Sequence, residues 1–114
     1  MASLPRSADR TAALDDAAFP AYSMGAAASV IAVTPAFLRA AEATGLFEAA
    51  RSDGGHRRYS RNDLQRANRA RELVDDGIGL DAAARIVALE YQLAAAHAMI
   101  QTLRRKIRPR TRSR

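Results

Sequence analysis

Hydrophobic positions in this chain fall into short segments, separated by residues typical of turns and helix ends. The first segment, residues 24–31, follows Ser23, whose hydroxyl can accept a hydrogen bond from a free amide at a helix start. The second, residues 35–43, follows Thr34 as N-cap and starts with Pro35 at the first helical position. Two short helices joined by so tight a connection predict a helix-turn-helix.

Two short strands are predicted next, at residues 47–51 and 56–59, joined by an Asp-Gly-Gly turn. A hairpin that follows a helix-turn-helix is a wing. Side chains alternate along a strand, so Arg57 and Arg58 point to opposite faces. One can then reach a phosphate while the other packs its stem or pairs with an acid. Tyr59 can pack its ring below and offer its hydroxyl to a phosphate, but it is equally suited to the core.

The C-terminal half is predicted to be helical. Ser60 caps a helix that ends near Asp76, glycines interrupt it, and another helix covers residues 80–88. Apolar residues then recur at alternating steps of three and four, which predicts a coiled-coil seam. One alternative is an amphipathic helix that folds back on its own domain. Because the domain is complete before the seam begins, we expect a homodimer. The seam positions are Ile86, Leu89, Leu93, Ala96, Ile100, Leu103 and Ile107.

The composition indicates a small domain that would gain stability by pairing with a second copy of the chain. The chain has 114 residues, of which 48% are hydrophobic but only 5% aromatic, so the core is thin and rich in alanine. It has no cysteine, which excludes disulfides and thiolate metal sites. We expect no cofactor and no metal. No apolar run is long enough for a membrane span, and the start of the chain is unlike a secretory signal. We therefore expect a cytoplasmic protein.

Charge is distributed unevenly along the chain. Residues 104–114 carry seven positive charges and no negative ones, although the net charge of the whole chain is +6. Residues 34–71 hold eight arginines and four acids, whereas residues 72–103 hold one arginine and five acids. A basic middle containing a wing indicates nucleic-acid binding better than the basic tail does.

The stretch YSMGAAASVIAVTPAFLRAAEATGLFEAARSDGGHRRYS resembles the DNA-binding domain of MerR-superfamily transcription regulators. The resemblance covers residues 22 to about 93, and the GGHRRYS and ARIVALEYQL segments are most similar to the heat-shock repressor HspR and its short actinobacterial relatives. It implies a mainly α fold, a winged helix-turn-helix followed by a C-terminal dimerisation helix that pairs antiparallel. It also implies binding to an inverted-repeat operator in double-stranded DNA, with repression favoured over activation.

The resemblance and the residue pattern together give the expected DNA-binding residues: Ser23, Thr34, Pro35, Phe37, Arg39, Arg51, His56, Arg57, Arg58 and Tyr59. The sequence departs from the family pattern at two places. Ala40 and Ala41 stand where tyrosines usually contact phosphates, and Ala32 replaces the usual glycine of the turn. Alanine is tolerable there if its φ angle stays negative.

We expect four regions: a flexible arm at residues 1–21, the winged helix-turn-helix at 22–85, the dimerisation helix at 86–107 and a basic disordered tail at 108–114. Nothing in the sequence suggests an enzyme. RNA polymerase and a chaperone are further candidate partners of a nucleoid-associated regulator. Two alternatives are a chaperone-modulating module and an excisionase-like DNA-bending protein. The exposed arginines argue against the first, and the regular seam argues against the second.

Overall fold

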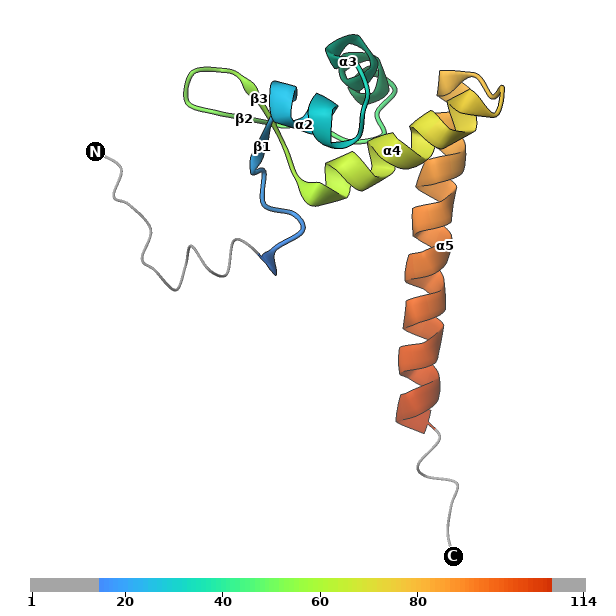
Figure 1. The fold of residues 1–114 in the computed structure, drawn as a ribbon. Coiled ribbons are helices and arrows are strands. Elements are labelled where there is room, and N and C mark those ends of the chain that lie inside the picture. The colour runs from blue at the N-terminus through green and yellow to red at the C-terminus, as the bar shows by residue number, and fades with distance from the viewer. Residues whose placement is uncertain (1–14, 108–114) are drawn as a thin grey trace, which may run out of the picture.

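The computed structural model describes residues 15–107, which are mainly helical, as predicted (Figure 1). Helices α2 and α3 and a small sheet form a head, α4 passes along it, and much of α5 extends away from it. The elements in chain order are β1 (Tyr22–Ser23), α2 (Met24–Val30), α3 (Pro35–Ala43), β2 (Ala50–Arg51), β3 (Arg57–Tyr59), α4 (Arg61–Asp75) and α5 (Leu80–Ile107).

The predicted helix-turn-helix is confirmed, with α2 and α3 capped as the sequence indicated. The Ser23 hydroxyl accepts a hydrogen bond from the amide of Ala26 at 3.2 Å, and the Thr34 hydroxyl accepts one from the amide of Phe37 at 3.0 Å. Pro35 occupies the start of α3. These bonds satisfy amides that have no partner inside the helix, so local chemistry fixes both helix starts.

The turn between α2 and α3 does not meet the condition under which alanine is well tolerated there, because Ala32 has a φ of 56° and not a negative value. The amide of Val33 donates to the carbonyl of Ala28 at 2.9 Å, and the amide of Ala32 donates to the carbonyl of Ser29 at 3.3 Å. This pair of bonds is the Schellman arrangement, which requires a left-handed residue after the helix. Alanine is therefore held in a conformation that favours glycine.

Replacing Ala32 with glycine should raise the free energy of unfolding by about 0.5–1 kcal/mol, because it removes this local strain. Urea denaturation followed by circular dichroism measures the change. Ala40→Gly on the exposed side of α3 is the matched control, and it should lower stability by about 1 kcal/mol. Equal destabilisation by the two substitutions would contradict the strain at the turn.

The predicted wing is present, although its strands are shorter than expected. β3 lies between β1 and β2 and is antiparallel to both. Arg58 is opposite Ser23 on one side and Ala50 on the other. At the tip, Gly55 has a φ of 83°, and its amide donates to the carbonyl of Ser52 at 2.9 Å. The glycine thus permits the reversal that the Asp-Gly-Gly sequence predicted.

Small side chains build the core, which consists of two clusters. The first joins α2, α3, the sheet and the start of α4, and its largest fully buried side chains are Leu38 and Tyr59. The ring of Tyr59 meets that of Phe47 edge to face, with centroids 6.0 Å apart. The second lies between α4 and α5, where Val87 is fully buried. A core built in this way orients α3 and the wing as one unit.

Part of the predicted N-terminal arm is ordered against α4. The amide of Asn62 donates to the carbonyl of Ala17 at 3.0 Å, and Arg61 Nη2 donates to the carbonyl of Asp15 at 3.2 Å. Residues 15–21 therefore differ from the flexible arm expected there. The rest of the predicted arm, residues 1–14, and the predicted basic tail, residues 108–114, lie outside the described residues.

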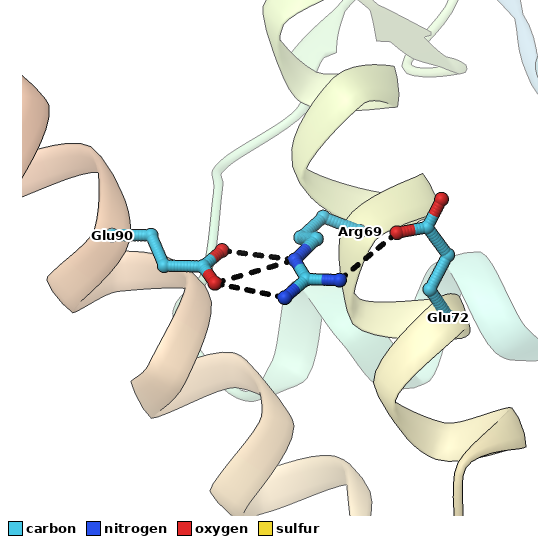
Figure 2. A network of polar contacts seen from close by, with 3 residues as sticks. All are labelled: Arg69, Glu72 and Glu90. Carbon is cyan, nitrogen blue, oxygen red and sulfur yellow. Dashed lines mark hydrogen bonds and ion pairs between the residues drawn. The ribbon is translucent and has the colours of Figure 1, made fainter.

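Helix α5 is continuous for 28 residues, so it crosses the predicted boundary at residues 85 and 86 without a break. Its first turns pack on α4, and an ion-pair network joins the two helices (Figure 2). Arg69 donates to both carboxylate oxygens of Glu90, at 2.9–3.3 Å, and to Glu72 at 3.0 Å. The hydrogen bonds from Arg69 lower the pKa of Glu90. The buried packing between α4 and α5 orients α5 relative to the head, and this exposed network adds only modestly to it.

Candidate nucleic-acid interface

A hollow of about 370 Å³ lies between the start of α2, the outer side of α3 and the wing. Four of its lining residues are arginines, and none of those described is an acid. The lining comprises Ser23, Met24, Arg39, Arg51, Gly55, His56, Arg57 and Arg58. So many guanidinium groups around one open surface suit a ligand that carries several negative charges.

Arg39 extends from the exposed side of α3. Leu38 and Ala41 face the core, so Arg39 points outward. Its Nη1 lies 3.5 Å from the sulfur of Met24, the one side-chain contact that holds the guanidinium among the described residues. A thioether is a weak acceptor, so Arg39 can exchange this contact for a stronger acceptor on a ligand.

The wing supplies Arg51, His56 and Arg58. Arg51 Nη1 donates to the carbonyl of Gly55 at 3.2 Å, so this arginine braces the turn while it remains exposed. The amide of His56 donates to the hydroxyl of Ser52 at 3.2 Å, and the imidazole is exposed. Arg58 is half-buried on the central strand and faces the same hollow. All three can approach a phosphate without a change in the backbone.

Arg57 also lines the hollow, but an acid holds it. Its Nε donates to Glu42 Oε1 at 2.7 Å, with 28% of the arginine side chain and 15% of the glutamate side chain exposed. The strand pattern had predicted that Arg57 and Arg58 would point to opposite faces, one toward a phosphate and the other packing its stem or pairing with an acid. The acid pair is present, but both arginines line the same hollow. Glu42 was not among the predicted site residues, although it is the only acid between Thr34 and Phe47 in a basic stretch.

Tyr59 differs from the interface prediction, because it is a core residue with no exposed surface. Its hydroxyl is buried, and no hydrogen-bond partner for it occurs within residues 15–107. Burial raises its pKa, and the nearby carboxylate of Glu42 raises it further. The Tyr59 side chain therefore packs in the core beneath the wing, and its buried hydroxyl cannot contact a phosphate.

The remaining predicted contacts divide between surface and core. Thr34 and Pro35 are exposed at the start of α3, where free amides and the helix dipole favour an anion. Ser23 lines the hollow while it caps α2. Phe37 instead is half-buried and packs on both core clusters, with the Arg71 guanidinium 5.4 Å from its ring centroid. Its position differs from that expected of a DNA contact.

The predicted seam on α5 is a second exposed surface. Leu89, Leu93, Ile100, Leu103 and Ile107 are between 44% and 66% exposed, and Ala96 is exposed between them. Ile86 differs, because it is half-buried against the second core cluster. Met99, at 60% exposed, joins the same side of the helix, although the heptad pattern did not single it out.

Other kinds of site receive no support from the described residues. Within residues 15–107, no group of three or more His, Asp or Glu side chains could hold a metal ion. No single described helix is long and apolar enough to cross a membrane. Only the pair α2 and α3, taken together across a bend of 99°, has the necessary length and composition.

This architecture matches that of one family of known proteins. Residues 22–90 match the family described as MerR HTH family regulatory protein, from β1 through the first part of α5. A search of curated proteins found no significant match. The match spans more than half of the chain and includes the helix-turn-helix, the wing and the α4–α5 pair. The chain therefore belongs to the MerR family of helix-turn-helix regulatory proteins.

Proposed function

We propose that this protein is a sequence-specific DNA-binding transcription regulator that works as a homodimer on an inverted-repeat operator. The observation that carries the proposal is the arginine-lined hollow between α3 and the wing, in a chain of the MerR family. In this proposal α3 enters the major groove, and the wing grips the flanking backbone. Selection of bound duplexes from a random pool tests it. An enriched inverted repeat supports the proposal, and an unenriched pool contradicts it.

The arginines have different tasks in this proposal. Arg39 lies on the exposed side of α3 and reads a base edge, since the paired donors of a guanidinium match guanine in the major groove. Arg51, Arg57 and Arg58 lie on the hairpin and meet phosphates, which gives affinity without sequence preference. The alanines at 40 and 41 provide no phosphate contact, so the wing arginines carry more of the backbone binding.

The homodimer is proposed from the outer face of α5. Apolar side chains of this size rarely stay exposed in such a row, and a second copy would cover them. An antiparallel register that sets Leu89 against the partner's Ile107, and Leu93 against the partner's Leu103, covers the whole row. Ala96 then faces the partner's Ile100. This register also brings Glu90 near the partner's Arg104.

The neighbouring register, one heptad away, is less favourable. It would set Ile107 against the partner's Ala82 and bring Arg85 near the partner's Lys106. The pairing of Ile107 with Ala82 loses apolar contact, and the pairing of Arg85 with Lys106 places like charges together. Ile86 is already covered by its own domain, so the favoured register does not need it.

Cysteine cross-linking should detect the favoured register, because the chain has no cysteine of its own. Under mild oxidation, the double variant Leu93→Cys/Leu103→Cys should form covalent dimers in high yield. Leu93→Cys alone should not, since the two copies of residue 93 would lie about 15 Å apart along the helices. Cross-linking of the single variant would indicate parallel helices, and preferential cross-linking of Leu93→Cys/Ala96→Cys would indicate the shifted register.

Repression is the proposed outcome of binding. The likeness of the GGHRRYS segment to HspR-like members favours a protein that occupies its operator. A nucleoid-associated cytoplasmic location follows from that role. RNA polymerase or a chaperone would be the partner through which such a regulator is controlled.

A further inference from the structure

Glu42 connects α3 to β3 and to the residue just before β2. It lies near the C-terminal end of α3, and both of its carboxylate oxygens accept hydrogen bonds. Oε1 accepts from Arg57 Nε on β3 at 2.7 Å, and Oε2 accepts from the amide of Ala49, beside β2, at 3.2 Å. Its side chain is only 15% exposed, so water competes little for these bonds. Glu42 itself is not among the residues that line the hollow.

The bond from Arg57 Nε to Glu42 leaves the terminal nitrogens of Arg57 available for binding. Among the described contacts, only Nε is used, and the side chain still lines the hollow. A guanidinium has five N–H donors, so the terminal nitrogens keep about four after Nε is engaged. Those nitrogens form the paired donor arrangement that fits a phosphate.

We propose that Glu42 is a positioning residue for DNA binding: it fixes Arg57 through Nε, so that the terminal nitrogens are presented to a backbone phosphate. This inference rests on the proposed DNA binding and adds the residue that prepares the wing for it. A free arginine loses much side-chain entropy when it is immobilised on a ligand. Glu42 has already restricted the side chain, and its bond to Ala49 keeps the carboxylate in place.

The opposite effect is also physically possible. Glu42 could restrain Arg57 and compete with phosphate, in which case its removal would tighten binding. Simple removal of the carboxylate does not separate the two effects, because loss of a negative charge favours DNA by itself. Two neutral side chains of similar length are therefore compared. Glu42→Gln keeps one acceptor oxygen, which can serve Arg57 if the bond from the Ala49 amide is given up, and Glu42→Met has no acceptor oxygen.

The experiment measures binding to a duplex of arbitrary sequence, about 30 base pairs long, over a range of salt concentrations. Glu42→Met should bind about three- to tenfold more weakly than Glu42→Gln. For Glu42→Met, the slope of log affinity against log salt concentration should become shallower by about one unit for each lost phosphate contact, as expected of Arg57→Ala. Glu42→Gln should keep the slope of the unmodified protein. In an Arg57→Ala background the two Glu42 variants should bind equally.

Thermal melting monitors the fold of each variant. If Glu42→Met does not fold, Glu42→Asp is compared with the unmodified protein instead, because the shorter carboxylate keeps the charge and should lose the bond to Arg57. Equal binding and equal slopes for the Gln and Met variants would overturn the inference, as would tighter binding by the Met variant. A Gln–Met difference that persists without Arg57 would assign the effect to Ala49 instead and overturn it also. Failure of the unmodified protein to bind any duplex would overturn the proposed function as well.

Discussion

Replacing Leu93 and Ile100 with aspartate should convert the protein from a dimer into a monomer. Both side chains are exposed in a single copy, so the head should stay folded. In the proposed dimer they are buried, and each unpaired carboxylate there costs several kcal/mol. Light scattering at tens of micromolar should give the mass of one chain, and operator binding should fall steeply because each monomer reaches only one half-site.

Ala94→Asp/Gln101→Asp provides the matched control. Both positions are exposed on α5 and lie outside the seam, and the substitutions add the same charge. This variant should remain dimeric and bind its operator. A dimer that survives aspartates at 93 and 100, or that is lost equally in the control, would contradict the seam as the interface.

Arg39→Ala should remove most of the protein's preference for its operator. One well-placed arginine contributes about 1–3 kcal/mol of discrimination at its base pair, and a dimer loses that contact at both half-sites. The expected loss is therefore about 2–6 kcal/mol of specific binding. Binding to arbitrary duplex should weaken far less. Fluorescence anisotropy with both duplexes at one salt concentration measures the two losses side by side.

Arg85→Ala is the control for this substitution, since it removes an exposed arginine from α5, outside the hollow. Its effect on either duplex should be small. If Arg39→Ala weakened both duplexes by the same factor, Arg39 would be a phosphate contact. Sequence would then have to be read by other residues at the start of α3, such as Thr34.

The sequence predicted most accurately what local chemistry decides. Ser23, Thr34 and Ser60 each have a side-chain oxygen that suits a free amide at a helix start, and all three helices begin where those residues indicated. The Asp-Gly-Gly turn likewise located the hairpin. In each case the residues that form the bond lie within a few positions of one another, so the pattern alone contains the answer.

Contacts between distant segments were not predictable in the same way. Glu42 and Arg57 are fifteen positions apart, and their pairing depends on how the wing folds back over α3. Tyr59 suited both surface and core, and the tertiary packing around it, including the edge-to-face contact with Phe47, places it in the core. At Ala32 the difficulty is local: the short turn imposes a left-handed φ whatever the side chain, so alanine adopts it as well.

Helix α5 lies between these two cases. Its heptad pattern predicted the exposed row, yet the same pattern included Ile86, which its own domain covers. A periodic apolar face indicates that something packs there but does not identify the partner. Helix α4 covers the first turns of α5 and leaves the rest exposed, and that division follows from tertiary structure alone.

The most direct measurement is a competition titration between two duplexes: the inverted repeat enriched from a random pool and a scrambled version of the same base composition. Near physiological salt, the affinity of the proposed regulator for the repeat should exceed its affinity for the scrambled duplex by about a thousandfold or more. One dimer should bind each copy of the repeat. Equal affinity for the two duplexes, or a full preference for a single half-site, would contradict a dimeric, sequence-specific DNA-binding protein.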